Sequence, residues 1–125
     1  MKKIKSFEDA CKALGIKTTL PVVKGLPAQH QEAIIAHYKL VTITEALNEG
    51  WKPNWNNIDE WKWNIWWDVK ASSKKPSGSG LSFFGADYWF TNTDVGSRLC
   101  FKSRELAEYA AKTFKKLYEQ SYLLP

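Results

Sequence analysis

The chain has 125 residues, a formal net charge of +5, 44% hydrophobic residues and 14% aromatic residues. Its length fits one domain, residues 1–125, that is large enough to bury a hydrophobic core. No apolar run approaches the roughly 18 residues of a membrane span, and acidic residues soon follow the basic start, so we expect neither a membrane segment nor a signal peptide. Two isolated cysteines, Cys11 and Cys100, predict buried thiols in a reducing compartment instead of a disulfide framework.

The N-terminal part of the chain predicts two helices. The first is short, with Ser6 in the N-cap position and Gly15 as its C-terminal stop. The second is longer, starts near Pro27 and ends at Gly50. Apolar residues cover more than half of its circumference, which indicates a central helix packed on two sides. A run of β-branched residues weakens its middle and leaves a kink or break near Lys39 open.

Six of the seven tryptophans lie in one short segment, WKPNWNNIDEWKWNIWW at 51–67. Its first part is predicted to be a loop, because proline and asparagine are frequent there. Residues 60–69 then alternate with period two, which favours a strand, although an apolar helical spacing leaves a helix open. The face expected to point inward carries Trp61, Trp63, Ile65, Trp67 and Val69. The opposite face carries Lys62, Asn64, Trp66 and Asp68, which makes Trp66 the best candidate for an exposed ring.

The C-terminal half predicts two further strands and a helix. The low-complexity segment ASSKKPSGSG at 71–80 is expected to be a mobile loop that leads to a second strand at 81–92. RLCFK at 98–102 is predicted to be a third short strand, and Ser103 the N-cap of an amphipathic C-terminal helix. The expected fold is α+β: two N-terminal helices, a three-stranded antiparallel meander and a C-terminal helix packed on the sheet.

No arrangement of residues in the sequence predicts catalysis. His30 and His37 are seven residues apart, which exceeds the i,i+4 spacing of a metal-chelating pair on a helix. The cysteines form no CxxC pair, and no glycine-rich phosphate loop is present. We therefore expect no catalytic residues, no metal and no cofactor, and we predict that the protein is not an enzyme.

The aromatic residues instead predict a surface that binds another protein, since exposed tryptophan and tyrosine are enriched at protein contact sites. The candidates are Trp51, Trp55, Trp66 and Tyr88. An alternative is an interface for single-stranded DNA or RNA, in which bases stack on tryptophan and lysines follow the phosphates. The candidates for that interface are Lys62, Lys70, Lys74, Lys75 and Trp66. The identity of the partner and the oligomeric state stay open.

Three segments also carry a resemblance: SFEDACKALGI at 6–16, GWKPNWNN at 50–57 and GSRLCFKSRELAEYAAKTF at 96–114. They are similar to a family of short uncharacterised proteins from phages and prophages of gut bacteria. Where this chain has KWNIWW at 62–67, that family has a tyrosine-rich stretch with a proline, which favours a strand over a helix. The resemblance implies an origin in a mobile element and a location in the host-cell cytoplasm or the virion, without secretion. It brings no catalytic residues with it.

Overall fold

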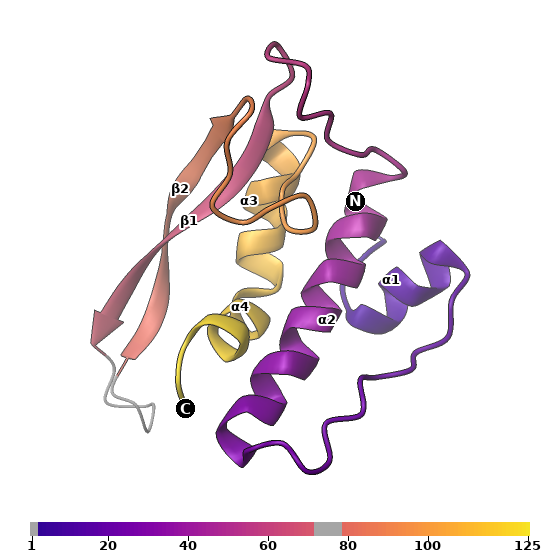
Figure 1. The fold of residues 1–125 in the computed structure, drawn as a ribbon, viewed down its shortest axis with the longest axis vertical. Helices are drawn as coiled ribbons and strands as arrows, with labels where there is room; N and C mark the ends of the chain where they lie inside the picture. The colour runs from indigo at the N-terminus through magenta and orange to yellow at the C-terminus, as the bar shows by residue number, and fades with distance from the viewer. Residues whose placement is uncertain (1–2, 72–78) are drawn as a thin grey trace.

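Four helices and one β-hairpin make up the part of the chain that the computed structural model describes, residues 3–71 and 79–125 (Figure 1). In chain order, the elements are α1 (Phe7–Leu14), α2 (Ala28–Asn48), β1 (Lys62–Ala71), β2 (Ser79–Trp89), α3 (Arg104–Thr113) and α4 (Lys115–Tyr122). The fold is therefore α+β, as predicted. The loop predicted to be mobile at 71–80 falls mainly on 72–78, which lie outside the described residues.

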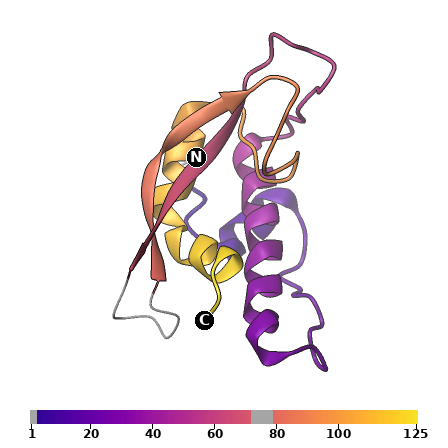
Figure 2. The same cartoon turned by 60° about the vertical axis from the view of Figure 1, so that its left-hand side comes forward.

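The elements are arranged in layers (Figures 1 and 2). Helices α3 and α4 pack against the hairpin, α2 packs against α3 and α4, and α1 packs against α2. This confirms that the second helix is packed on two sides. The buried core lies between these layers and includes Leu40 and Ile43 of α2, Leu106 of α3 and Tyr118 of α4.

Local signals at the ends of α1 act as predicted. The Ser6 hydroxyl oxygen accepts a hydrogen bond from the backbone N–H of Asp9 at 3.1 Å. Gly15 follows the helix with φ 68°, a left-handed conformation that glycine adopts without steric cost. The face that carries Phe7 and Cys11 is buried against α2.

Helix α2 runs without interruption, so the break considered near Lys39 does not occur. The hydroxyls of Thr42 and Thr44 donate to the carbonyl oxygens of Tyr38 and Leu40, at 3.0 and 2.7 Å. A buried threonine can therefore be accommodated in this helix, because its hydroxyl is satisfied one turn back along the chain.

The predicted single C-terminal helix is instead two helices, divided at Phe114, whose φ of −116° is not helical. The N-cap prediction holds, since the Ser103 hydroxyl oxygen accepts from the backbone N–H of Leu106 at 3.3 Å. Phe114 and Tyr118 are both buried, and the rings of Tyr118 and Trp67 have centroids 5.3 Å apart. The change of direction thus lets α4 place Tyr118 in the core between α2 and the hairpin.

The sheet has two strands among the described residues, and not the three expected. The expected third strand is reduced to one bridge, in which Phe101 exchanges two hydrogen bonds with Trp63, at 2.9 and 2.8 Å. On its other side, this segment is held by Asn48 at the end of α2, which bonds the backbones of Cys100 and Lys102. Since the N-cap of α3 follows directly, the chain has no room to extend the pairing with β1.

The hairpin is antiparallel, with Lys62 opposite Trp89 and Val69 opposite Leu81. Its register shifts between the pairs Trp66–Gly85 and Trp67–Phe83, so that β2 contains one extra residue, Phe84. Such a bulge increases the local twist, and the two strands indeed cross strongly in Figures 1 and 2.

Candidate interaction surface

The largest departure from the sequence prediction is Lys62, which is fully buried. Its ammonium nitrogen donates to the carbonyl oxygen of Asn57 at 3.0 Å and lies 3.4 Å from Oε1 of Glu60. The same nitrogen lies 5.3 Å from the ring centroid of Trp55. The prediction that Lys62 faces solvent and contacts nucleic acid is therefore wrong. The loop before β1 folds back and encloses this side chain. Asn64, also predicted to face outward, is buried as well, whereas Val69, predicted to point inward, is 63% exposed, so the predicted alternation is wrong for these residues.

Two of the predicted contact tryptophans belong to the same loop and form hydrogen bonds within the protein. The indole N–H of Trp51 donates to Oε2 of Glu60 at 3.3 Å, and that of Trp55 donates to the hydroxyl oxygen of Ser97 at 2.7 Å. Oε1 of Glu60 additionally accepts from the backbone N–H of Asn54 at 2.6 Å. Trp51 and Trp55 are both partly buried, so their indole groups hold this loop in place.

The three tryptophans predicted to point inward have different environments. Trp63 and Trp67 are partly buried and pack against the core, as expected. Trp61 is 47% exposed, so the prediction of a core position is wrong for this residue. The reason is the length of the covering helices: α3 begins at Arg104, whose guanidinium carbon lies 5.9 Å from the Trp63 ring centroid. Trp61 precedes β1 and lies beyond that cover.

Trp61 belongs to a cluster of four rings that we call the aromatic patch: Trp61, Trp63, Tyr88 and Phe90. The rings of Trp61 and Tyr88 are stacked, with centroids 4.2 Å apart and planes 9° apart. Phe90 meets Tyr88 edge-on at 5.4 Å, and Trp63 meets it edge-on at 5.3 Å. Trp61, Tyr88 and Phe90 are 47%, 37% and 38% exposed. The patch therefore presents a mutually supported apolar surface to solvent.

Sequence reasoning identified only Tyr88 of this cluster as a contact residue. The alternation of residues 60–69 predicts a core position for Trp61, and no local pattern distinguishes Phe90. The hairpin register is the missing information, since Trp63 pairs directly with Tyr88 and thereby brings both aromatic ends together. The sequence does carry a signal for this cluster, because aromatic residues occur both at the start of the first strand and at the end of the second. Antiparallel pairing of the two strands places these residues side by side.

The other predicted contact residues do not join this patch. Trp66 is 41% exposed, as expected, but it lies three residues after Trp63 and therefore on the opposite face of β1 from Tyr88. Lys70 is exposed and lies 3.8 Å from the carboxylate of Asp68. Lys74 and Lys75 lie outside the described residues.

The outer edge of β2 is closed at two points to pairing with a further strand. The backbone N–H of Leu81 donates to Oε2 of Glu119 at 2.8 Å, and that of Tyr88 donates to Oδ1 of Asp87 at 2.7 Å. These N–H groups point away from β1. For Tyr88 this follows from its partner Trp63, whose backbone N–H and carbonyl oxygen bond Phe101 and not Tyr88. Carboxylates on an edge strand disfavour the addition of a further strand at this edge.

The cysteines are free and buried, as predicted. Burial raises the pKa of the Cys100 thiol to about 11, and burial, with a smaller effect of Glu8, raises the pKa of Cys11. Both thiols are therefore protonated at neutral pH, the form that is a poor nucleophile and a poor metal ligand. In the described part of the chain, no three His, Cys, Asp or Glu side chains lie close enough to hold a metal ion.

These pKa shifts predict that the free energy of unfolding decreases above about pH 9. The Cys100 thiol has its pKa raised from 9.0 to about 11 in the folded protein, so the unfolded chain loses this proton first as the pH rises. Burial raises the pKa of Tyr118 and Tyr122 in the same direction. We expect urea midpoints to fall between about pH 8 and about pH 10.5, and to fall less steeply in a Cys100→Ala variant. Urea midpoints that stay constant over this pH range would contradict the raised pKa of these buried groups.

Comparison with protein-family models, curated proteins and solved structures found no match to this chain. None of the described helices combines the length and the apolar character needed to cross a lipid bilayer.

Proposed function

We propose that the protein is a non-enzymatic binding module whose aromatic patch contacts another protein. The observation that carries this proposal is the stacked pair of Trp61 and Tyr88, which is fixed in place although both rings are exposed. Large apolar side chains that gather on the surface, instead of occurring singly, mark interaction sites. Tryptophan and tyrosine are also the side chains that most often dominate the binding energy of protein interfaces.

The patch is organised before any partner arrives. Each ring touches at least one other ring, and Trp63 anchors the group to the core. Little side-chain entropy is then lost on binding, which favours affinity. Arg104 lies at the margin, over the Trp63 ring, and its side chain is 58% exposed. It supplies hydrogen-bond donors beside an apolar centre, which is the usual anatomy of a protein interface.

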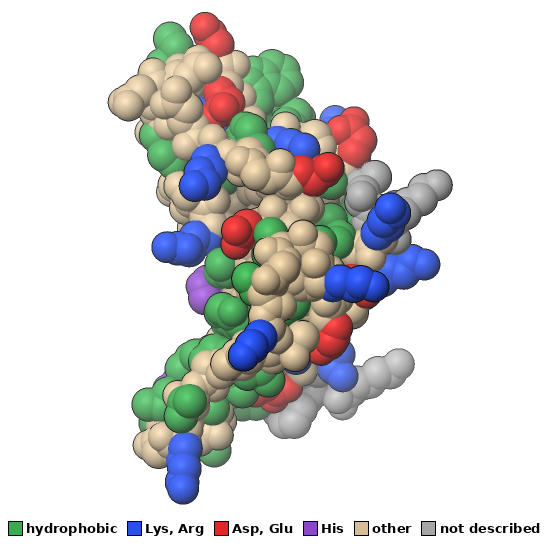
Figure 3. All heavy atoms as spheres, turned by 90° about the vertical axis from the view of Figure 1, so that its right-hand side faces the viewer, with side chains coloured by type: hydrophobic (Ala, Val, Ile, Leu, Met, Phe, Trp, Pro, Cys, Tyr) green, Lys and Arg blue, Asp and Glu red, His purple; other side chains and the backbone are tan. Residues whose placement is uncertain are grey.

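The alternative, binding of single-stranded nucleic acid, has less support. It requires exposed cations along a phosphate path, yet Lys62 is buried and Lys70 lies beside Asp68. On the face shown in Figure 3, lysine and arginine side chains are spread out with acidic side chains between them. The proposed origin in a phage or prophage, and the location in the host cytoplasm or virion, rest on the sequence resemblance alone.

The double variant Trp61→Ala/Tyr88→Ala is expected to lose its partner. Removing two central rings of an interface costs about 2 kcal/mol or more, which weakens binding by about thirtyfold. The measurement is a quantitative pull-down from a lysate of the organism that encodes the chain, with thermal unfolding to confirm that the variant is folded. Trp66→Ala is the matched control, because it removes an equally exposed indole from the opposite face of β1.

A protein retained by the unaltered chain and by Trp66→Ala, but not by the double variant, supports the proposal. Equal capture by all three, or capture lost only in Trp66→Ala, overturns it. A gel-shift series with single-stranded and duplex oligonucleotides at increasing salt tests the alternative in parallel, because phosphate contacts weaken steeply with salt.

A further inference from the structure

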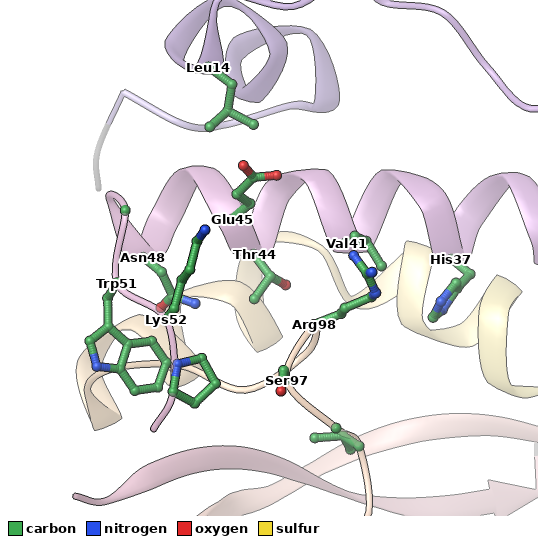
Figure 4. A pocket seen from close by; sticks show the side chains of 14 residues that line it. Leu14, His37, Val41, Thr44, Glu45, Asn48, Trp51, Lys52, Ser97 and Arg98 are labelled. Atoms are coloured by element: carbon green, nitrogen blue, oxygen red, sulfur yellow. The ribbon is translucent and has the colours of Figure 1, made fainter. Parts of the chain in front are cut away.

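A second surface feature, separate from the aromatic patch, is a groove of about 920 Å³ between α2 and two loops (Figure 4). One loop follows α2 and the other follows β2, and Leu14 of α1 adds to the lining from the other side of α2. Its apolar lining includes Leu14, Val41, Trp51 and Val95. A concave site of this size, mainly apolar with a few polar groups, is typical of small-molecule binding.

Internal hydrogen bonds fix the walls of the groove. The Trp51 indole bonds Glu60, and the Thr93 hydroxyl oxygen accepts from the backbone N–H groups of Val95 and Gly96, at 3.1 and 2.8 Å. Asn48, at the base, bonds the backbone on both sides of Phe101. The groove is therefore formed before a ligand binds, which lowers the entropic cost of binding.

The polar groups that remain for a ligand are mainly charged. The Thr44 hydroxyl and the Asn48 amide, which also line the groove, are used inside the protein. Lys52 and Arg98 extend from the two loops toward α2 (Figure 4). Among the described residues, neither cation has a carboxylate oxygen within 4.0 Å.

The charges of the groove sum to one positive charge, from Lys52 and Arg98 against Glu45, with His37 counted as neutral. The Glu45 carboxylate is directed toward Leu14, away from the loop that carries Arg98 (Figure 4). An anionic group that reaches Lys52 and Arg98 therefore compensates two exposed cations that have no carboxylate partner in residues 3–71 and 79–125. Charge-assisted hydrogen bonds of this kind are among the stronger polar contacts that a protein makes.

We propose that this groove binds a small organic anion. Its apolar body lies against Leu14, Val41 and Trp51, and its carboxylate, sulfonate or phosphate group is held between Lys52 and Arg98. This site is distinct from the aromatic patch, and the proposal does not depend on the proposed protein contact.

The test compares two probes that share one ring system. 8-Anilinonaphthalene-1-sulfonate is anionic, whereas N-phenyl-1-naphthylamine lacks the sulfonate, and both report binding by fluorescence. For Lys52→Gln/Arg98→Gln we expect about tenfold weaker binding of the sulfonate and little change for the neutral amine. Glu45→Gln, which removes the opposing charge, should strengthen sulfonate binding about threefold. Lys112→Gln/Lys115→Gln is the control, since it removes the same charge from exposed positions that do not line the groove.

The proposal is overturned if the full chain does not bind the sulfonate, or if the control weakens binding as much as the groove variant does. It is equally overturned if both probes respond alike, because the anion would then contribute nothing. The Trp61→Ala/Tyr88→Ala variant separates the two surfaces. Sulfonate binding retained in that variant supports the groove, whereas binding lost there places the probe on the aromatic patch.

Discussion

Replacing Glu60 with glutamine is expected to lower the free energy of unfolding by about 3 kcal/mol, although Glu60 is itself only partly buried. The cause is its partner, Lys62, which is fully buried 3.4 Å from Oε1 of Glu60. Without the carboxylate, the buried ammonium group has only uncharged partners, namely the Asn57 carbonyl, the Trp55 ring and the amide oxygen of the new glutamine. An uncompensated buried charge is strongly destabilising, whereas losing one weak contact is not.

Replacing the lysine of the pair should lower the free energy of unfolding much less than replacing the glutamate. Lys62→Met shortens the side chain by one atom and leaves Glu60 with two donors, from Asn54 and Trp51, so we expect a loss of about 1 kcal/mol or less. The double variant Glu60→Gln/Lys62→Met should recover most of the stability lost in Glu60→Gln. Lys70→Met is the matched control, because its exposed ion pair is expected to contribute less than about 0.5 kcal/mol.

Urea unfolding followed by circular dichroism measures these differences. Equal losses for Glu60→Gln and Lys62→Met would show that the pair acts through packing alone. No loss in either would show that the loop before β1 does not enclose Lys62 in solution.

Asn48→Ala is expected to cost about 3 kcal/mol, because it leaves a buried carbonyl oxygen of Cys100 and a partly buried N–H of Lys102 without their partner. The Asn48 amide nitrogen donates to the carbonyl oxygen of Cys100 at 2.9 Å, and its oxygen accepts from the backbone N–H of Lys102 at 3.0 Å. These two bonds hold the segment around Phe101 between α2 and β1. The substitution should also accelerate hydrogen exchange at the Lys102 amide, which reports on this segment directly.

Thr44→Val is the appropriate control for Asn48→Ala, since it removes a buried hydroxyl from the same helix. That hydroxyl donates to Leu40 within α2, so its loss leaves no segment unattached, and we expect less than about 1 kcal/mol. Comparable losses in the two variants, or unchanged exchange at Lys102, would contradict the role given to Asn48.

Features that depend on neighbours in the sequence were predictable. The N-caps at Ser6 and Ser103 and the left-handed stop at Gly15 follow from local backbone chemistry, and all three are present. The strand with tryptophan on its inward face was also predictable, because its alternation is a property of the segment itself. The prediction holds for Trp63 and Trp67.

The remaining features depend on contacts between distant segments. The burial of Lys62 requires that the preceding loop fold back, and a lysine between tryptophans gives no sign of this. The exposure of Trp61 depends on where α3 begins, and the reduction of the third strand depends on Asn48. The aromatic patch joins residues at the start of β1 and at the end of β2, so its formation depends on the register of the hairpin.

Hydroxyl-radical footprinting of the free protein and of the captured complex tests the proposed contact surface most directly. The account predicts that Trp61, Tyr88 and Phe90 are oxidised readily in the free protein and protected in the complex. Trp66, on the opposite face of β1, should be oxidised equally in both. Protection of Trp66 with no change at Trp61, Tyr88 and Phe90 would contradict the account.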